Sequence, residues 1–198
     1  MKFENMINDI EKMRINSSDP NRCVTIFGSA RFEDTHEHCY EAYTLAKRLA
    51  LKNYIIVTGG GGGIMKAANK GAFDAKQSNV GINVILPNEQ RINEFVTEGT
   101  VFSNLALRKV ALIEKSKYFV IFPGGYGTLD ELFELLVLVQ NGLYDAKVFL
   151  YGTKFYAPLV EFLENSLLAE GTISKKDLEI YTLTDDIEFI YNEILKGI

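Results

Sequence analysis

Residues 118–141 read YFVIFPGGYGTLDELFELLVLVQN, and this stretch constrains the fold more than any other part of the chain. It runs from a short, continuously apolar segment through a glycine-bearing turn into a very apolar helix. Strands that are apolar along their whole length are typical of a parallel sheet whose two faces are both covered. The stretch therefore predicts one strand–turn–helix unit of an α/β protein.

Further strands and helices alternate on both sides of this unit. Short apolar, β-branched runs predict strands at residues 23–27, 54–58, 80–86, 118–122 and 148–151, with a shorter one near 180–183. Helical patterns cover residues 36–51, 64–75, 105–115, 129–141, 156–169 and 187–195. We therefore expect an α/β fold with a doubly wound, Rossmann-like parallel sheet flanked by helices, its first five strands in the order 3-2-1-4-5.

The chain has the size and composition of a single domain. It contains 198 residues, of which 47% are hydrophobic and 24% charged, and it shows no internal repeat or linker. We therefore expect residues 1–198 to form one domain. Within residues 1–20, an apolar stripe at helical spacing predicts an N-terminal helix packed on the sheet, with a subunit contact as the alternative. The stripe consists of Phe3, Met6, Ile7, Ile10 and Met13.

Composition also limits the compartment and the partners. No apolar run reaches the ~20 residues needed to span a bilayer, and the N-terminal segment is too charged for a signal peptide. Cys23 and Cys39 give no disulfide framework and are expected to be reduced thiols. The net charge of −5 disfavours a broad nucleic-acid surface. We expect a cytoplasmic protein with no membrane or nucleic-acid partner, in which a few local groups hold any phosphate.

Glycine-bearing turns follow three of the predicted strands. Gly28-Ser29-Ala30 follows the first strand, residues 59–65 (GGGGGIM) follow the second, and residues 123–128 (PGGYGT) follow the fourth. In the order 3-2-1-4-5 these strands are neighbours, so their carboxyl ends flank the switch point where doubly wound folds bind ligands. The three turns are therefore expected to meet in one crevice.

Glycine turns of this kind suit a phosphate group. Glycine lets backbone N–H groups approach a ligand without a Cβ in the way, and helix N-termini add unpaired N–H donors. Residues 59–65 lack the Gly-Lys-Ser/Thr ending of a P-loop, and no GxGxxG follows the first strand. A nucleoside triphosphatase or a standard nicotinamide dehydrogenase is therefore disfavoured. Ordinary tight turns remain the alternative explanation of the glycines.

Glu131 has two interpretations. Thr128 and Glu131 have the spacing of a capping box, in which both side chains only cap the start of a helix. Alternatively, Glu131 lies at the mouth of the crevice. A carboxylate there can stabilise positive charge on a ribose ring and can orient or deprotonate an attacking water.

Two interpretations also exist for Arg108 and Lys109, which lie on the helix before the fourth strand. An adjacent basic pair on a helix is usually a solvated face. The alternative is that Arg108 points into the crevice, where it meets a phosphate, the ribose hydroxyls or Glu131.

Other candidate residues have simpler explanations. His36 and His38 are two residues apart on a helix, so they face different ways and are expected to be solvated residues of a helix start rather than metal ligands. Tyr126 is a turn residue or stacks on a base. Asp185-Asp186 is expected to cap the last helix.

Residues 123–131, PGGYGTLDE, match the pattern PGGxGTxxE. Together with Arg108-Lys109 and the glycine turn at residues 59–63, this motif resembles the LONELY GUY family of phosphoribohydrolases, long labelled possible lysine decarboxylases. The resemblance covers about residues 23 to 151. It implies hydrolysis of the N-glycosidic bond of a nucleoside 5'-monophosphate, with a cytokinin-type or purine base, to the free base and ribose 5-phosphate.

The resemblance also implies a set of site residues, with no metal and no organic cofactor. The catalytic pair falls on Arg108 and Glu131. The substrate-binding residues fall on Gly28, Ser29, Gly60, Gly61, Met65, Lys109, Gly124, Gly125, Gly127 and Thr128.

The sequence departs from the family pattern in the second turn. That turn usually reads GGxxGxMG, whereas Lys66 follows Met65 here. Residues 86–90 (LPNEQ) and Asn93 resemble a longer, bacterial subgroup, some of whose members form hexamers of dimers. We therefore expect a homodimer or a hexamer of dimers.

Other functions compete with hydrolysis. A non-catalytic nucleotide carrier or sensor would use the same turns, with Glu131 serving only as a cap. A scaffold would bind no nucleotide at all. Lysine decarboxylation is disfavoured, because neither Lys66 nor Lys109 lies in a recognisable pyridoxal-phosphate motif.

Overall fold

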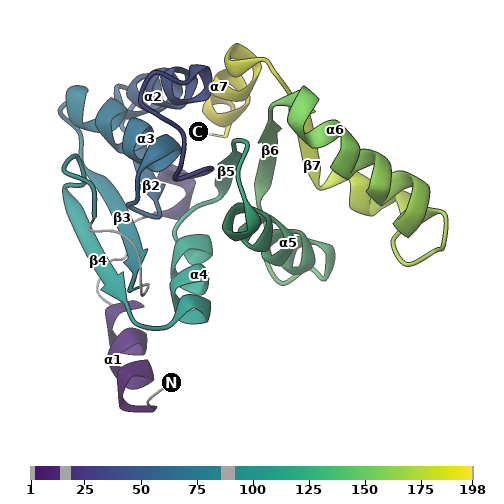
Figure 1. Cartoon of the computed structure of the whole chain (residues 1–198), viewed down its shortest axis with the longest axis horizontal. Coiled ribbons are helices and arrows are strands. Elements are labelled where there is room, and N and C mark those ends of the chain that lie inside the picture. Colours follow the sequence, from purple (N-terminus) through teal and green to yellow (C-terminus); the bar gives the residue numbers. More distant parts are fainter. Residues whose placement is uncertain (1–2, 14–18, 86–91, 198) are drawn as a thin grey trace.

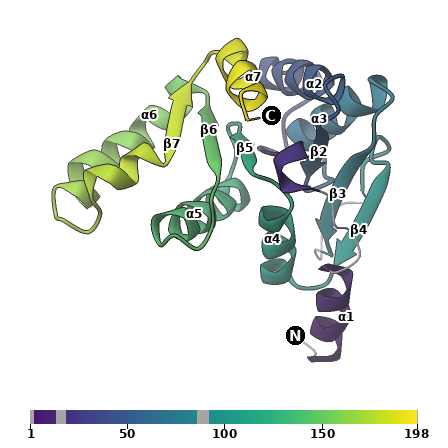
Figure 2. The same ribbon diagram turned by 180° about the vertical axis from the view of Figure 1, so that it is seen from behind.

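The computed structural model describes residues 3–13, 19–85 and 92–197. Its strands are β1 (Cys23–Phe27), β2 (Ile55–Thr58), β3 (Asn79–Val84), β4 (Glu98–Phe102), β5 (Tyr118–Ile121), β6 (Lys147–Tyr151) and β7 (Tyr181–Thr184). They form one parallel sheet in the order β4-β3-β2-β1-β5-β6-β7 (Figures 1 and 2). The predicted fold class, a Rossmann-like α/β sheet, is confirmed.

Helices cover both faces of the sheet. One face carries α2 (Glu37–Ala50), α3 (Gly63–Asp74) and α7 (Ile187–Leu195), and the other carries α4 (Leu105–Glu114), α5 (Tyr126–Gln140) and α6 (Thr153–Phe162) (Figures 1 and 2). The remaining segments are the N-terminal helix α1 (Phe3–Met13), 3-10 turns at Pro20–Arg22 and Lys175–Glu179, and a π-helical turn at Leu163–Leu168. Among the described residues, no helix is long and apolar enough to span a bilayer.

The strands are apolar along their length because each one serves two cores. In β1, Val24 and Ile26 pack beneath α2 and α3, whereas Cys23 and Phe27 pack beneath α4 and α5. Cys23 and Cys39 are both buried and belong to cores on opposite faces of the sheet, so they do not pair with each other.

The predicted order of the first five strands is confirmed as β3-β2-β1-β5-β6. From β1 the chain winds outward to β4, and α4 then returns it to β5, directly beside β1. The helices that follow β1 and β5 lie on opposite faces of the sheet. The switch point therefore lies between β1 and β5.

The sequence did not predict β4. Its segment, EGTVF, lies at the edge of the sheet, and Phe102 is the one buried residue in it. An edge strand that is exposed along most of its length lacks the apolar run that marks the interior strands. The predicted end of β3 at Leu86, and residues 86–90 as a whole, lie outside the described residues.

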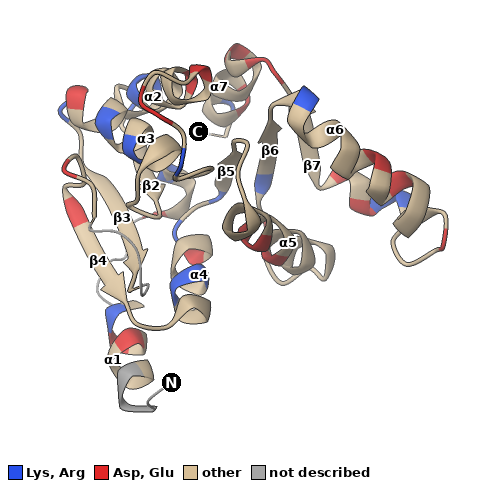
Figure 3. Cartoon of the chain, viewed as in Figure 1, with Lys and Arg blue, Asp and Glu red and all other residues tan. Residues whose placement is uncertain are grey.

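The helices differ from prediction mainly at their starts. α5 begins at Tyr126 rather than at Leu129, and α6 begins at Thr153 rather than at Tyr156. In the last helix, Asp186 accepts a hydrogen bond from Phe189 N at 2.9 Å, as expected of an N-cap. Asp185 instead accepts one from Thr153 N at 2.7 Å, at the start of α6. Residues of both charge signs lie along α2, whereas α5 carries acidic residues alone (Figure 3).

The N-terminal helix α1 lies beside α4 and β4 at one end of the molecule (Figure 1). Met13 packs against one core, but Ile7 and Ile10 are 47% and 44% exposed, so the predicted apolar stripe is only partly buried. The side chain of Phe3 lies outside the described part of the structure. A subunit contact through this stripe remains a prediction.

Asp9 links α1 to the start of α4 by hydrogen bonds. Its buried carboxylate accepts hydrogen bonds from Ser103 N and Asn104 N, both at 2.9 Å, and from Ser103 Oγ at 2.8 Å. Lys12 Nζ lies 2.8 Å from the other oxygen. Burial works to raise the pKa of Asp9, but the hydrogen bonds from Lys12 and Ser103 outweigh it and lower that pKa below its ordinary value. Asp9 therefore holds the start of the helix that carries Arg108.

We predict that Asp9→Ala lowers the free energy of unfolding by about 2 to 3 kcal/mol at pH 7, because charge-assisted hydrogen bonds are lost and their donors remain. A lowered carboxyl pKa stabilises the fold above the unfolded pKa and ceases to do so as the pH falls through the folded pKa. The difference from wild type should therefore shrink below about pH 4. Urea unfolding from pH 7 down to pH 3 measures it. An equal difference at every pH would contradict the role of the charge.

Candidate active site

The glycine turns after β1, β2 and β5 meet at the carboxyl edge of the sheet, around a cavity of about 770 Å³. Its wall is formed by Gly28, Ser29, Ala30, Arg31, Gly59, Gly61, Met65, Asn83, Val84, Leu105, Arg108, Gly124, Gly125, Tyr126, Gly127, Thr128, Leu129 and Glu131. The cavity opens at the switch point, where a ligand site was expected.

Backbone hydrogen bonds hold the three turns together. Ser29 N donates to Pro123 O at 3.0 Å, and Ile64 N donates to Ser29 O at 3.0 Å. Gly63 has a φ of +56°, and a Cβ on it would overlap Ser29 O. A side chain at this position would therefore separate the first turn from the second.

Arg108 and Glu131 form a buried ion pair in the cavity wall. Arg108 Nη1 donates to Glu131 Oε1, and the two side chains are only 11% and 10% exposed. Arg108 Nε donates to the carbonyl of Ile82 at 2.9 Å, which fixes the guanidinium against β3. Of the possibilities open for Arg108, the structure shows the one in which it points into the crevice and meets Glu131.

The environment of Glu131 shifts its protonation equilibrium. Burial raises the pKa of Glu131, and the charge of Arg108 opposes the shift without cancelling it. A carboxylate with a raised pKa in a cavity accepts a proton more readily than an exposed one, which suits a general base.

The capping box predicted from Thr128 and Glu131 is wrong. The N-cap of α5 is Gly125, with ψ of −158° and no side-chain cap, so Thr128 and Glu131 both lie inside the helix. Glu131 is committed to Arg108 instead. The spacing matched a capping box by coincidence, because the helix starts three residues before the predicted start.

The start of α5 presents backbone donors to the cavity. The first intrahelical bond is from Leu129 N to Gly125 O at 3.1 Å, which leaves the N–H groups of residues 126–128 without intrahelical acceptors. A Cβ added to Gly125 or Gly127 would meet no atom within 4 Å. Open space therefore lies above these two residues, at a helix terminus that favours anions.

Two of the predicted binding residues lie outside the cavity wall. Lys109 Nζ lies 2.8 Å from Asp130 and 2.6 Å from Glu134, on the side of α5 turned away from the cavity. Gly60 has a φ of +68° and packs against Gly81, so it shapes the second turn from behind. The other predicted residues, Gly28, Ser29, Gly61, Met65, Gly124, Gly125, Gly127 and Thr128, all line the cavity.

Lys66, the departure from the family pattern, does not intrude on the cavity. Met65 lines the wall, whereas the next residue along the helix points outward, with Lys66 Nζ 3.0 Å from Asp34 and 3.5 Å from Glu94. Neither Lys66 nor Lys109 lines the cavity.

Sequence reasoning missed an asparagine network behind the second turn. Asn69 Oδ1 accepts from Thr58 Oγ1 at 2.7 Å and from Asn93 Nδ2 at 3.0 Å, and Asn93 Nδ2 also donates to Gly61 O at 2.9 Å. Asn83, also unremarked in the sequence, lines the cavity. Asparagine is depleted in strands, so Asn79 and Asn83 inside an apolar strand were the signal available.

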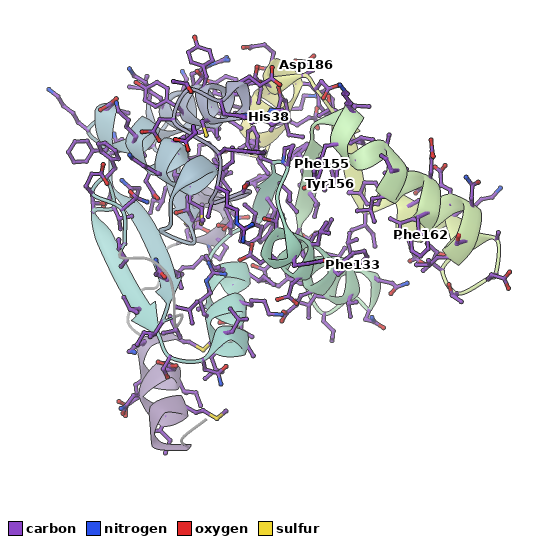
Figure 4. The ribbon with its side chains drawn as sticks, viewed as in Figure 1. His38, Phe133, Phe155, Tyr156, Phe162 and Asp186 are labelled. Carbon is purple, nitrogen blue, oxygen red and sulfur yellow. The ribbon has the colours of Figure 1, made fainter. Side chains whose placement is uncertain are left out.

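His36 is the N-cap of α2, and His38 lies in the first turn of that helix (Figure 4 for His38). His36 Nδ1 accepts from His38 N at 3.2 Å, and the His36 ring stacks on Phe32 with 3.9 Å between centroids. Both residues are half-buried rather than fully solvated. In the described part of the chain, no group of three or more His, Cys, Asp and Glu residues is arranged to hold a metal. Tyr126 is 93% exposed at the rim of the cavity.

Residues 65–194 match the family model described as "Possible lysine decarboxylase". The chain is 30% identical over 166 residues to cytokinin riboside 5'-monophosphate phosphoribohydrolase LOG1 of Arabidopsis thaliana, which covers 82% of this chain and 76% of that one. The chain belongs to the LONELY GUY family.

A further family relative is the probable cytokinin riboside 5'-monophosphate phosphoribohydrolase LOG4 of Oryza sativa subsp. japonica. It is 28% identical over 170 residues, or 84% of this chain and 74% of the relative. The solved structure of TM1055 matches with a TM-score of 0.67 at 20% identity, over 89% of this chain and 99% of that one. The molybdenum cofactor carrier protein of Chlamydomonas reinhardtii matches with a TM-score of 0.61 at 22% identity, over 88% and 96%. At these identities the structural matches establish the shared fold alone.

We predict that Gly59→Ala displaces Arg108 in this LONELY GUY protein while the fold persists. A Cβ at Gly59 would overlap the guanidinium and would lie 2.8 Å from Met65 Sδ, and both are flexible side-chain ends. An unpaired, buried Glu131 should then lower the free energy of unfolding by about 3 kcal/mol at pH 7. The loss should shrink at acidic pH, since a protonated Glu131 needs no partner.

A crystal structure of Gly59→Ala and urea unfolding at pH 7 and pH 4 measure both effects. Gly125→Ala is the matched control, because its Cβ meets nothing within 4 Å. An unmoved guanidinium in Gly59→Ala would contradict the prediction.

Proposed function

We propose that the protein hydrolyses the N-glycosidic bond of a nucleoside 5'-monophosphate, releasing the free base and ribose 5-phosphate. The observation that carries the proposal is the buried Arg108–Glu131 pair, set in the wall of a cavity beside the PGGYGT turn. Relatives named as cytokinin riboside 5'-monophosphate phosphoribohydrolases support the substrate class. Cytokinin-type and ordinary purine monophosphates are the substrates proposed.

The phosphate would bind at the start of α5. The N–H groups of residues 126–128 have no intrahelical acceptors, and glycine at 125 and 127 leaves the space above them open. A helix N-terminus places partial positive charge at the same point. Lys109, paired with Asp130 and Glu134, is not needed for this contact.

Glu131 would carry the chemistry. As the bond between C1' and the base nitrogen breaks, its electron pair leaves with the base and positive charge builds on the ribose. The Glu131 carboxylate stabilises that charge and takes the proton from the attacking water, whose oxygen forms the new bond to C1'. The departing base takes a proton from solvent and Glu131 releases the proton from the attacking water to solvent, so that one water is consumed and the carboxylate is restored. The raised pKa of Glu131 favours the proton transfer.

Arg108 would position Glu131 and contact the ribose hydroxyls. Its Nε is held by Ile82 O, so the guanidinium presents its remaining donors along the cavity wall from a fixed anchor. Hydrolysis at this site needs no metal or organic cofactor.

Lysine decarboxylation, named in the description of the family model, fits the site poorly. Pyridoxal phosphate requires a lysine for its Schiff base. Among the described residues that line the cavity there is no lysine.

We predict that Glu131→Gln lowers kcat by about 10²- to 10⁴-fold with little change in nucleotide affinity, because the amide keeps the size of the side chain but cannot accept the proton. The test is chromatography of the bases released from AMP, GMP, CMP and N6-isopentenyl-AMP. Glu134→Gln is the matched control, since Glu134 lies one turn further along α5 and pairs with Lys109 outside the cavity.

Each outcome of this test is informative. Release of base by wild type and Glu134→Gln, but not by Glu131→Gln, supports the hydrolase and ranks its substrates. Tight binding by wild type without release from any substrate contradicts the hydrolase and leaves a nucleotide carrier or sensor. Failure to bind any nucleotide contradicts both.

We further propose that the protein is a cytoplasmic homo-oligomer, a dimer or a hexamer of dimers. One face of α5 carries Tyr126, Phe133 and Val137, which are 93%, 38% and 53% exposed (Figure 4 for Phe133). These residues are seven and four positions apart, so they lie on one side of the helix. Tyr126 also lines the cavity, so a second copy on this face would stand at its mouth.

We predict that Val137→Glu shifts the protein towards the monomer in sedimentation velocity, because a charge would be desolvated in the interface. Asn192→Glu, at an exposed position of α7 on the opposite face of the sheet, is the control for added charge. A wild type that is monomeric at micromolar concentration would contradict the oligomer.

A further inference from the structure

Asn83 lies in the part of β3 that extends beyond the end of the neighbouring strand β2. The last pair between β2 and β3 joins Thr58 to Gly81, whereas pairing of β3 with β4 continues to Val84 and Phe102. Beyond Gly81 the chain of β2 has turned away into the glycine turn. One edge of residues 82–84 therefore has no neighbouring strand and faces the cavity. On this edge, the carbonyl of Ile82 accepts a hydrogen bond from Arg108 Nε.

The side-chain amide of Asn83 has a defined orientation. Val84 N donates to Asn83 Oδ1 at 2.6 Å, and because a backbone N–H requires an acceptor, the oxygen must be on that side. Nδ2 therefore lies on the other side of the amide, beside the second turn and 3.7 Å from the position of a Cβ added to Gly60, whose neighbours Gly59 and Gly61 line the cavity.

The two N–H donors of Nδ2 have no acceptor among the described residues. Asn83 is only 7% exposed, and it lines the cavity. Nδ2 is not among the fully buried atoms that lack a partner, so it keeps some contact with the solvent that fills the cavity, and a ligand acceptor can take the place of that water.

Asn83 stands at the end of the cavity opposite the phosphate donors. Those donors follow β5, and in the sheet β1 and β2 separate β5 from β3. The Arg108–Glu131 pair reaches from β3 to α5 between the two ends. Val84 lies next to Asn83, and Met65 and Leu105 are further apolar side chains of the same cavity wall. Apolar walls with one placed polar group suit the flat faces and one edge of a nucleobase.

We propose that Asn83 is a specificity-determining residue whose Nδ2 donates a hydrogen bond to a ring-nitrogen acceptor of a purine base. The inference rests on the proposed function for the identity of the ligand. As the glycosidic bond breaks, its electron pair stays on the base and makes N3 and N7 stronger acceptors. The hydrogen bond then strengthens in the transition state, so Asn83 contributes to kcat as well as to binding.

The test compares AMP with 7-deaza-AMP, 3-deaza-AMP and 2'-deoxy-AMP. Binding is measured by calorimetry in a Glu131→Gln background, which prevents turnover, and kcat and KM are measured with Glu131 present. The variants are Asn83→Ala and Asn83→Asp. The aspartate keeps the oxygen that accepts from Val84 N and removes both donors, and thermal unfolding verifies that each variant is folded. Val84→Ala is the control, because it alters the apolar wall and leaves the donor in place.

With Asn83 present, one of the two deaza analogues should bind about tenfold more weakly than AMP, which corresponds to one lost hydrogen bond. Both Asn83 variants should bind that analogue and AMP equally, and should lower kcat for AMP. Val84→Ala should weaken all four ligands by the same factor.

Three results would overturn the inference. These are equal binding of AMP and both deaza analogues by the protein with Asn83, discrimination that persists in both variants, or a loss of discrimination confined to 2'-deoxy-AMP, which would assign the donor to the ribose. A wild type that shows the expected binding pattern without releasing base contradicts the proposed hydrolysis and leaves the role of Asn83 intact.

Discussion

The buried ion pair of Arg108 and Glu131 is the interaction on which the rest of the site depends. Two charges with side chains about one-tenth exposed are stable only if each has a partner held in place. Arg108 is held by the carbonyl of Ile82, and its helix is held at the start by Asp9. Gly59 leaves the guanidinium its space. The N-terminal helix, the second glycine turn and β3 thus all converge on one side chain.

Glycine is needed for a different physical reason in each of the turns around the cavity. Gly63 combines a left-handed φ of +56° with a close approach to Ser29 O, so it joins two turns. Gly125 and Gly127 face open space and keep backbone donors accessible at the start of α5. The second turn is also supported from behind by Thr58, Asn69 and Asn93, whose hydrogen bonds fix a segment that has no side chains of its own.

The sequence predicted the parts of the fold that burial determines. β1 and β5 were found because both their faces are covered, whereas β4 was not, because Phe102 is the one buried residue of that edge strand. Within the site, the PGGxGTxxE motif located Glu131, but spacing alone could not separate a capping box from an ion pair, since the two differ by where α5 begins. Asn83 belongs to no motif, and the role proposed for it depends on β2 ending before β3.

The ion pair also explains how one carboxylate can serve both stability and the proposed reaction. Burial raises the pKa of Glu131, and Arg108 limits that rise, so the group stays poised to accept a proton. In the resting protein the compensating positive charge is the guanidinium. In the proposed transition state a second positive charge develops on the ribose, beside a carboxylate that is already desolvated and fixed in position. An exposed glutamate would have to lose its bound water and its rotational freedom during the reaction. Glu131 has lost both on folding, where the ion pair with Arg108 offsets the free-energy cost, so the reaction does not include that cost.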